Sequence, residues 1–238
     1  MSIAPKDRIY VALDTPDVGA AIAMAQQLAG YVGGVKLGKE FFVANGPDAV
    51  RAVGGLGMPV FLDLKFHDIP NTVAGAVRSA LPSAPAILNV HAMGGSAMMR
   101  AAKQALDSGD PGDGPAPMLI AVTVLTSLGD DDLAELGISV TAEQQVVRLA
   151  KLTQSCGLAG VVCSPREIGP IRAACGDDFK LVVPGIRPTW AATGDQKRIT
   201  TPSDAVAAGA DYLVIGRPIT SADDPVAAAK MIADEIGG

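Results

Sequence analysis

The chain has 238 residues, of which 49% are hydrophobic and 18% are charged, and its formal net charge is -6. This length fits one large domain or two small ones, and the apolar content can fill a sizeable core, which excludes a disordered chain or a disulfide-stapled miniprotein. Acidic residues outnumber basic ones by 25 to 19. We therefore expect no general nucleic-acid-binding surface and no binding to anionic membranes.

The cysteines and the N-terminus indicate a reducing compartment. Cys156, Cys163 and Cys175 are odd in number and lack CxxC spacing, so they predict reduced thiols rather than a disulfide framework or a zinc site. The N-terminal residues lack the apolar run of a secretion signal, and no segment offers 18 uncharged apolar residues. We expect a soluble, cytoplasmic protein.

Short β-type runs alternate with alanine-rich helical stretches along the chain. The expected strands are Arg8–Leu13, Gly34–Leu37, Val60–Lys65, Ile87–His91, Met118–Val124, Gly160–Cys163, Leu181–Val183 and Tyr212–Ile215. The expected helices include Val18–Ala29, Thr72–Leu81, Ser96–Leu106, Ala142–Ser155, Arg166–Ala174 and Pro225–Ile236. The run Asp107–Pro117, rich in Gly, Pro and Asp, predicts an exposed loop. Eight strands with intervening helices favour an α/β fold, a single (β/α)8 TIM barrel over residues 1–238, rather than an open doubly wound sheet.

Charged residues follow the expected strands at the end where such barrels place their active sites. Asp14 ends the first strand, Lys36 lies in the second, and Asp63 and Lys65 lie in the third. Because Asp63 and Lys65 are two positions apart, their side chains share a face, which we expect to be the barrel interior. A buried ion pair can serve structure alone. Two further charges at the same mouth, Lys36 and Asp68, would form a network too costly for stability alone, which favours function.

The last two strands lead into segments suited to phosphate. Arg187 and Gln196 follow the seventh strand, and Gly216 and Arg217 follow the eighth. Barrels commonly bind phosphate after these two strands, through backbone N–H groups and basic side chains. A Gly-Arg pair by itself is as well explained by an ordinary turn with a surface arginine. Its placement beside the seventh-strand loop favours a phosphate site.

The run Asp63–Thr72, DLKFHDIPNT, resembles the signature of the orotidine 5'-monophosphate decarboxylases of the bacterial type. Segments similar to this family follow along nearly the whole chain: Val11–Asp14, Val35–Gly38, Asn89–Ala92, Ala121–Ser127, Pro184–Pro188, Gly194–Arg198 and Ile215–Pro218. Met93 and the segment Pro82–Pro85 depart from the family pattern at the rim of the fourth strand.

The resemblance implies a carbon-carbon lyase that converts orotidine 5'-monophosphate to UMP and CO2, the last step of de novo UMP synthesis, with no cofactor and no metal. It implies Lys65 as the proton donor in a catalytic network with Lys36, Asp63 and Asp68. Asp63 would also contact the substrate, and the other implied contacts are Asp14 and Lys36 to the ribose, Thr126 to the pyrimidine, and Arg187, Gln196, Gly216 and Arg217 to the phosphate. It further implies a homodimer in which Asp68 and the substrate-binding Thr72 reach into the partner's pocket.

Two other functions stay open at this point. A magnesium-dependent phosphosugar decarboxylase or epimerase on the same barrel shares the Asp-x-Lys-x-x-Asp pattern, although the continuation Ile69–Thr72 resembles the orotidylate enzymes. A non-catalytic sensor of a phosphorylated ligand would keep Gln196 and Arg217 but would not need the charge network.

Overall fold

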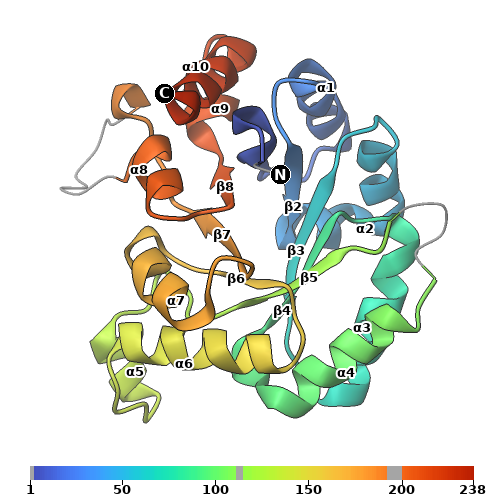
Figure 1. Ribbon diagram of the computed structural model, residues 1–238. Coiled ribbons are helices and arrows are strands. Elements are labelled where there is room, and N and C mark those ends of the chain that lie inside the picture. The colour runs from blue at the N-terminus through green and yellow to red at the C-terminus, as the bar shows by residue number, and fades with distance from the viewer. Residues whose placement is uncertain (1–2, 111–114, 192–199) are drawn as a thin grey trace.

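The computed structural model describes residues 3–110, 115–191 and 200–238, and its strands close into a parallel barrel in chain order (Figure 1). The strands are Ile9–Leu13 (β1), Gly34–Gly38 (β2), Val60–Phe66 (β3), Ile87–His91 (β4), Met118–Val122 (β5), Gly160–Val162 (β6), Lys180–Pro184 (β7) and Tyr212–Ile215 (β8). The pairing of β1 with β8 closes the sheet. The predicted TIM barrel is confirmed.

Helices surround the barrel and pack against its outer face (Figure 1). The α-helices are Val18–Leu28 (α1), Lys39–Gly54 (α2), Pro70–Ala80 (α3), Gly95–Asp107 (α4), Asp130–Glu135 (α5), Ala142–Ser155 (α6), Ile168–Cys175 (α7), Pro202–Ala207 (α8), Arg217–Thr220 (α9) and Pro225–Gly237 (α10). Short 3-10 turns are Pro5–Arg8 (η1), Leu81–Ser83 (η2), Ala92–Gly94 (η3), Pro165–Glu167 (η4) and Thr189–Ala191 (η5). Within the described ranges, no helix is long and apolar enough to cross a membrane.

Helix α2 lies in a crossover where a helix was expected but no range was predicted from the sequence. Gly46 and Pro47 lie in its middle, and this pair is typical of a helix end. Gly46 adopts a φ of 71°, which kinks the chain and joins two helical segments into one run. A glycine allows this left-handed conformation at little steric cost. The kinked helix begins at Lys39, directly after β2, and runs through the kink to Gly54.

The residues that point into the barrel change from apolar to polar along the strands. One apolar cluster fills the interior: Tyr10, Ala12, Phe61, Ile87, Ile120, Val182 and Val214. Residues two positions further along a strand point in the same direction. Asp14, Asp63 and Asn89 each come two positions after a member of this cluster. The strand pattern therefore directs these polar side chains into the carboxyl end of the barrel.

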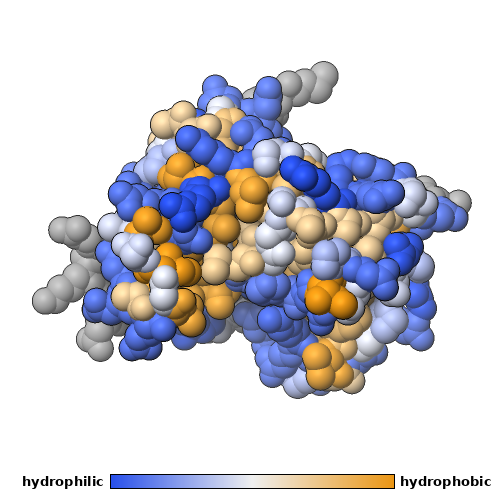
Figure 2. Space-filling model, turned by 90° about the horizontal axis from the view of Figure 1, so that it is seen from below, coloured by the Kyte–Doolittle hydropathy of each residue, from blue (hydrophilic) through white to orange (hydrophobic). Residues whose placement is uncertain are grey.

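Large hydrophobic side chains are also exposed on the surface. Figure 2 shows hydrophobic residues in several patches among hydrophilic ones on one face of the molecule. Over the described chain, the exposed large hydrophobic residues are Tyr31, Val43, Ile69, Met93, Leu125, Leu136, Trp190 and Met231. Ile69 and Met93 follow the neighbouring strands β3 and β4. The rim of the barrel near its charged end is thus partly apolar.

Candidate active site

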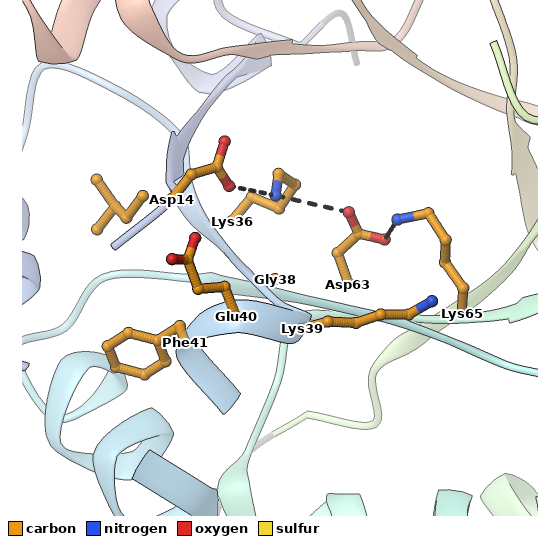
Figure 3. A pocket seen from close by; sticks show the side chains of 9 residues that line it. Asp14, Lys36, Gly38, Lys39, Glu40, Phe41, Asp63 and Lys65 are labelled. Carbon is orange, nitrogen blue, oxygen red and sulfur yellow. Dashed lines mark hydrogen bonds and ion pairs between the residues drawn. The ribbon is translucent and has the colours of Figure 1, made fainter. Parts of the chain in front are cut away.

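Four charged side chains form a row of alternating sign at the carboxyl end of the barrel (Figure 3). The Lys36 Nζ lies 3.3 Å from Asp14 Oδ1 and 3.6 Å from Asp63 Oδ2. The other carboxylate oxygen of Asp63 accepts a hydrogen bond of 2.6 Å from Lys65 Nζ. Asp63 therefore lies between two ammonium groups, and the structure brings together three of the four predicted network residues.

The parallel strands explain why these charges meet. Lys36 on β2 is in register with Ala12 on β1 and Phe61 on β3, two residues of the interior cluster, so it points inward as they do. The side chain of Lys36 is 11% exposed and that of Asp63 is 12% exposed. A Cβ atom at Gly38 would lie 3.4 Å from Lys36 Nζ, so the glycine leaves room for this ammonium group.

Strand β3 is irregular at Lys65. Leu62 pairs with Leu88 and Phe66 pairs with Val90, so four steps along β3 correspond to only two steps along β4. Lys65 has a φ of 54°, a left-handed conformation that costs a residue with a side chain about 1–2 kcal/mol. The bulge carries Lys65 away from the regular ladder and directs its side chain to Asp63.

Asn89 on β4 contacts both Asp63 and Lys65, and it was not among the site residues predicted from the sequence. Its side chain is fully buried, its Oδ1 accepts a 2.7 Å hydrogen bond from the Lys65 backbone N–H, and its Nδ2 donates a 2.7 Å hydrogen bond to Asp63 Oδ1. The available signal was its position, two residues after inward-facing Ile87 on a barrel strand.

The surroundings fix the charge states of two groups. Burial alone would raise the pKa of Asp63, but the charges of Lys36 and Lys65 and the hydrogen bonds from Lys65 and Asn89 outweigh burial and lower this pKa. Burial lowers the pKa of His91 to about 4, helped by the neighbouring His67, Lys39 and Lys65. At neutral pH Asp63 is therefore an anion and His91 is neutral.

Three adjoining cavities lead away from the charge row. The first, of about 170 Å³, is lined by the four charged residues together with Lys39 and Glu40 at the start of α2 (Figure 3). Asp14 also lines the second cavity, which has a volume of about 320 Å³. Arg217 and Ser221 line both this cavity and the third, which has a volume of about 340 Å³. The hollow therefore extends from Asp63 to the loops after β7 and β8.

The third cavity brings together the two arginines predicted to bind phosphate. Arg187 and Arg217 line it together with Trp190, Ala191, Pro218, Ser221 and Ala222. Gly185 begins the loop after β7 with a φ of 78°, and Gly216 lies at the end of β8 directly before Arg217. Gln196 lies outside the described residues. This end of the hollow carries two positive side chains, which suits an anionic group.

The other predicted site residues are exposed around the rim. Asp68 lies in the loop between β3 and α3, Thr72 lies in the first turn of α3, and Thr126 lies in the loop after β5. In the described part of this chain Asp68 forms no ion pair with Lys36 or Lys65, and its Oδ1 accepts a hydrogen bond from the Ile69 backbone N–H. A single chain therefore leaves the fourth network residue facing outward.

A second ion cluster at the amino end of the barrel offers a contrast. Asp211 pairs with Arg172 and, at 3.2 Å, with Lys180, and its Oδ2 also accepts a hydrogen bond from the Leu181 backbone N–H. None of the three cavities is lined by these residues. The ion pairs of Asp63 differ because they line an open cavity, where a ligand can reach the charges.

Comparisons with known proteins place the chain in one family. A model of the orotidine 5'-phosphate decarboxylase / HUMPS family matches residues 7–232. Orotidine 5'-phosphate decarboxylase from Rhodospirillum rubrum is 57% identical over 240 residues, covering 100% of this chain and 97% of its own. The protein of the same name from Paramagnetospirillum magneticum is 54% identical over 230 residues, covering 96% of this chain and 98% of its own.

The solved structures agree with the sequence comparisons. The crystal structure of orotidine 5'-phosphate decarboxylase from Lactobacillus acidophilus superimposes with a TM-score of 0.87 at 38% identity, over 97% of this chain and 99% of that one. An uncharacterized conserved protein from Geobacillus kaustophilus gives a TM-score of 0.85 at 38% identity, over 96% and 99% of the two chains. The chain therefore belongs to the orotidine 5'-phosphate decarboxylase / HUMPS family.

Proposed function

We propose that this protein decarboxylates orotidine 5'-monophosphate to UMP and CO2 without a cofactor, with Lys65 as the proton donor. The observation that carries the proposal is the hollow between the partly buried Lys36–Asp63–Lys65 row and a pair of arginines. A nucleoside monophosphate matches the two ends of this hollow, because its reacting base suits the charge row and its dianionic phosphate suits the arginines. The names of the relatives from R. rubrum and P. magneticum support the same substrate.

Lys65 has the charge and the place that this reaction needs. Breaking the bond between carbon 6 and CO2 leaves an electron pair in the plane of the ring, which the ring delocalises poorly. An ammonium group beside this carbon stabilises the developing charge and then transfers its proton to carbon 6. The 2.6 Å contact with Asp63 holds the Lys65 ammonium group in place before the reaction, and solvent returns a proton to Lys65 after the transfer.

Asp63 acts on the carboxylate that departs. Its lowered pKa keeps it anionic at neutral pH, so it faces the substrate carboxylate as a like charge. That repulsion is present in the ground state and is relieved when neutral CO2 leaves, which lowers the barrier to bond breaking. Lys36 holds Asp63 in place on its other side at 3.6 Å.

The remaining contacts position the substrate. Asp14 and Lys36 bind the ribose hydroxyls and Thr126 binds the pyrimidine. Arg187, Gln196, Gly216 and Arg217 bind the phosphate. The cavities that link Asp14 to Arg217 and Arg217 to Arg187 support this order along the hollow. Binding energy from the distant phosphate then helps the reacting end of the substrate to reach its transition state.

A homodimer would complete the site with Asp68 and Thr72 of the second chain. Two observations support this assembly: Asp68 and Thr72 are exposed in one chain, and Ile69 between them is 67% exposed. An apolar side chain flanked by site residues is typical of a surface that a partner covers. A cytoplasmic location fits an enzyme that makes a nucleotide for the cell.

The proposal is tested with purified protein, orotidine 5'-monophosphate and an excess of chelator. We expect loss of substrate absorbance and the appearance of one UMP per substrate consumed, at the same rate with and without the chelator. If well-folded protein gives no UMP, the proposal is wrong. Phosphorylated sugar acids with added magnesium would then be assayed, because the alternative decarboxylase or epimerase requires that metal.

A further inference from the structure

We infer that Asn89 is a positioning residue for the decarboxylation, and that it holds the Lys65 backbone and the Asp63 carboxylate in their reactive arrangement. The inference rests on the proposed function and adds to the site a residue on β4, a strand that supplies none of the other proposed site residues. Asn89 is separated from Lys65 by 24 residues in the sequence, yet its side chain contacts both Lys65 and Asp63.

The chemistry of its partners fixes the orientation of the Asn89 amide. The Lys65 backbone N–H can only donate, so the Asn89 carbonyl oxygen must face it. The ionised Asp63 carboxylate can only accept a hydrogen bond, so the Asn89 amino group must face this carboxylate. Both distances are 2.7 Å, and the amide is fully buried. At neutral pH an amide side chain of this length supplies the acceptor and the donor at once.

The first contact supports an unfavourable backbone conformation. Lys65 has a φ of 54° within a bulge, where its N–H has left the regular ladder. A buried N–H without a partner is costly, so a backbone released from Asn89 would relax toward an ordinary conformation. Such relaxation would rotate the Lys65 side chain away from Asp63. Asn89 thus determines where the proton donor stands.

The second contact shares one carboxylate oxygen with the proton donor. Asp63 Oδ1 accepts from both Lys65 Nζ and Asn89 Nδ2, while Oδ2 faces Lys36. The charged groups that face Asp63 are Lys36 from β2 and Lys65 from β3. Lys39 from α2 and neutral His91 from β4 also lie near the carboxyl end of the barrel, but neither contacts Asp63 directly. Asn89 therefore fixes the rotation of the carboxylate and adds to the stabilisation of its anionic form.

Two variants separate the contacts. Asn89→Leu keeps the branching of the asparagine side chain, with a larger volume, and removes both hydrogen bonds. Asn89→Asp keeps an acceptor for the Lys65 N–H but replaces the donor with a carboxylate beside Asp63. The control, Thr153→Val, removes a buried hydroxyl on α6 that donates a 2.8 Å hydrogen bond to the Leu149 carbonyl oxygen, outside the site. The kcat and KM for orotidine 5'-monophosphate are measured from pH 5 to 9, together with thermal unfolding.

For Asn89→Leu we expect kcat to fall by about ten- to a hundredfold, the effect of losing a buried hydrogen-bonding partner, with a much smaller change in KM. The acid limb of its kcat/KM profile moves to higher pH, because Asp63 loses a bond that lowers its pKa. For Asn89→Asp we expect activity to recover as the pH falls, since the new carboxyl group can donate to Asp63 once it is protonated. A wild-type kcat and pH profile in Asn89→Leu, or a loss no larger than that of Thr153→Val, overturns the inference.

A crystal structure of Asn89→Leu tests the same idea without turnover. We expect Lys65 to leave the left-handed region and its Nζ to move away from Asp63. An unchanged Lys65 conformation would show that Asn89 does not hold it. Wild-type protein that lacks activity would contradict the proposed function, whereas active wild type with an unaltered Asn89→Leu variant would contradict only this inference.

Discussion

At the scale of single residues, the surroundings of a charge decide its role. Asp63 and Asp211 are each 12% exposed, and each is paired with two cations. Asp211 also binds a backbone N–H at the amino end of the barrel, outside the three cavities, and holds strands together. Asp63 and its partners line a cavity. A substrate can therefore change the balance of charge around Asp63.

The phosphate end of the hollow can be tested at a single arginine. Arg217→Ala should lower kcat/KM for orotidine 5'-monophosphate by about ten- to a hundredfold, because one charge-assisted contact to the dianion is lost. The same substitution should leave the much slower reaction of orotidine, which has no phosphate, unchanged. An equal loss with both substrates would mean that Arg217 acts on the fold or on the chemistry rather than on the phosphate.

At the scale of elements, strand periodicity predicted part of the site. The two-residue spacing of Asp63 and Lys65 predicted that their side chains share a face. The two side chains do meet at 2.6 Å, but a bulge at Lys65 rather than regular alternation brings them together. The left-handed conformation of Lys65 and its contact with Asn89 depend on how β3 aligns with β4, which spacing within one strand does not specify. The bounds of helix α2 were not predicted, and Gly46 and Pro47 interrupt its helical pattern.

Two glycines, one between strands β6 and β7 and one in helix α3, give opposite predictions for stability. A Cβ atom at Gly160 would lie 2.1 Å from the Lys180 carbonyl oxygen, so Gly160→Ala must push the two strands apart. This substitution should lower the free energy of unfolding by about 2–3 kcal/mol or more. Gly75 lies inside α3 with open space around its Cβ position. Gly75→Ala should raise stability by about 0.5–1 kcal/mol. Denaturant unfolding of both variants checks the pair, and equal effects would contradict the packing described for the barrel.

At the scale of the whole molecule, the order of the strands joins residues that are far apart in the sequence. The barrel brings Asp14, directly after β1, beside Lys36 on β2, and β7 and β8 bring Arg187 to Arg217. The alternation of strand and helix predicted this architecture, since it depends on local patterns repeated along the chain. The place of Asp68 could not be predicted from these patterns, because a role in a shared site depends on a second copy of the chain.

The proposed sharing of the site between two chains can be tested by exchanging subunits. Lys65→Ala and Asp68→Ala should each be nearly inactive alone, because each lacks one member of every network. Mixed and allowed to exchange, they should recover up to about a quarter of wild-type activity, since a mixed dimer has one site with both residues intact and half of the dimers are mixed. Proven exchange without recovery would contradict the assembly, and so would wild-type protein that remains a monomer at assay concentrations.

The most direct test of the central claim compares two lysines in the same assay. In excess chelator, kcat for orotidine 5'-monophosphate is measured for the wild type, for Lys65→Ala, and for Lys103→Ala, which removes an equal charge from a surface ion pair with Asp107 on α4. We predict loss of at least about 10⁴-fold in Lys65→Ala, which lacks both the cation and the proton donor, and unchanged kcat in Lys103→Ala. A folded Lys65→Ala variant that keeps a tenth or more of wild-type kcat would contradict the claim that Lys65 delivers the proton.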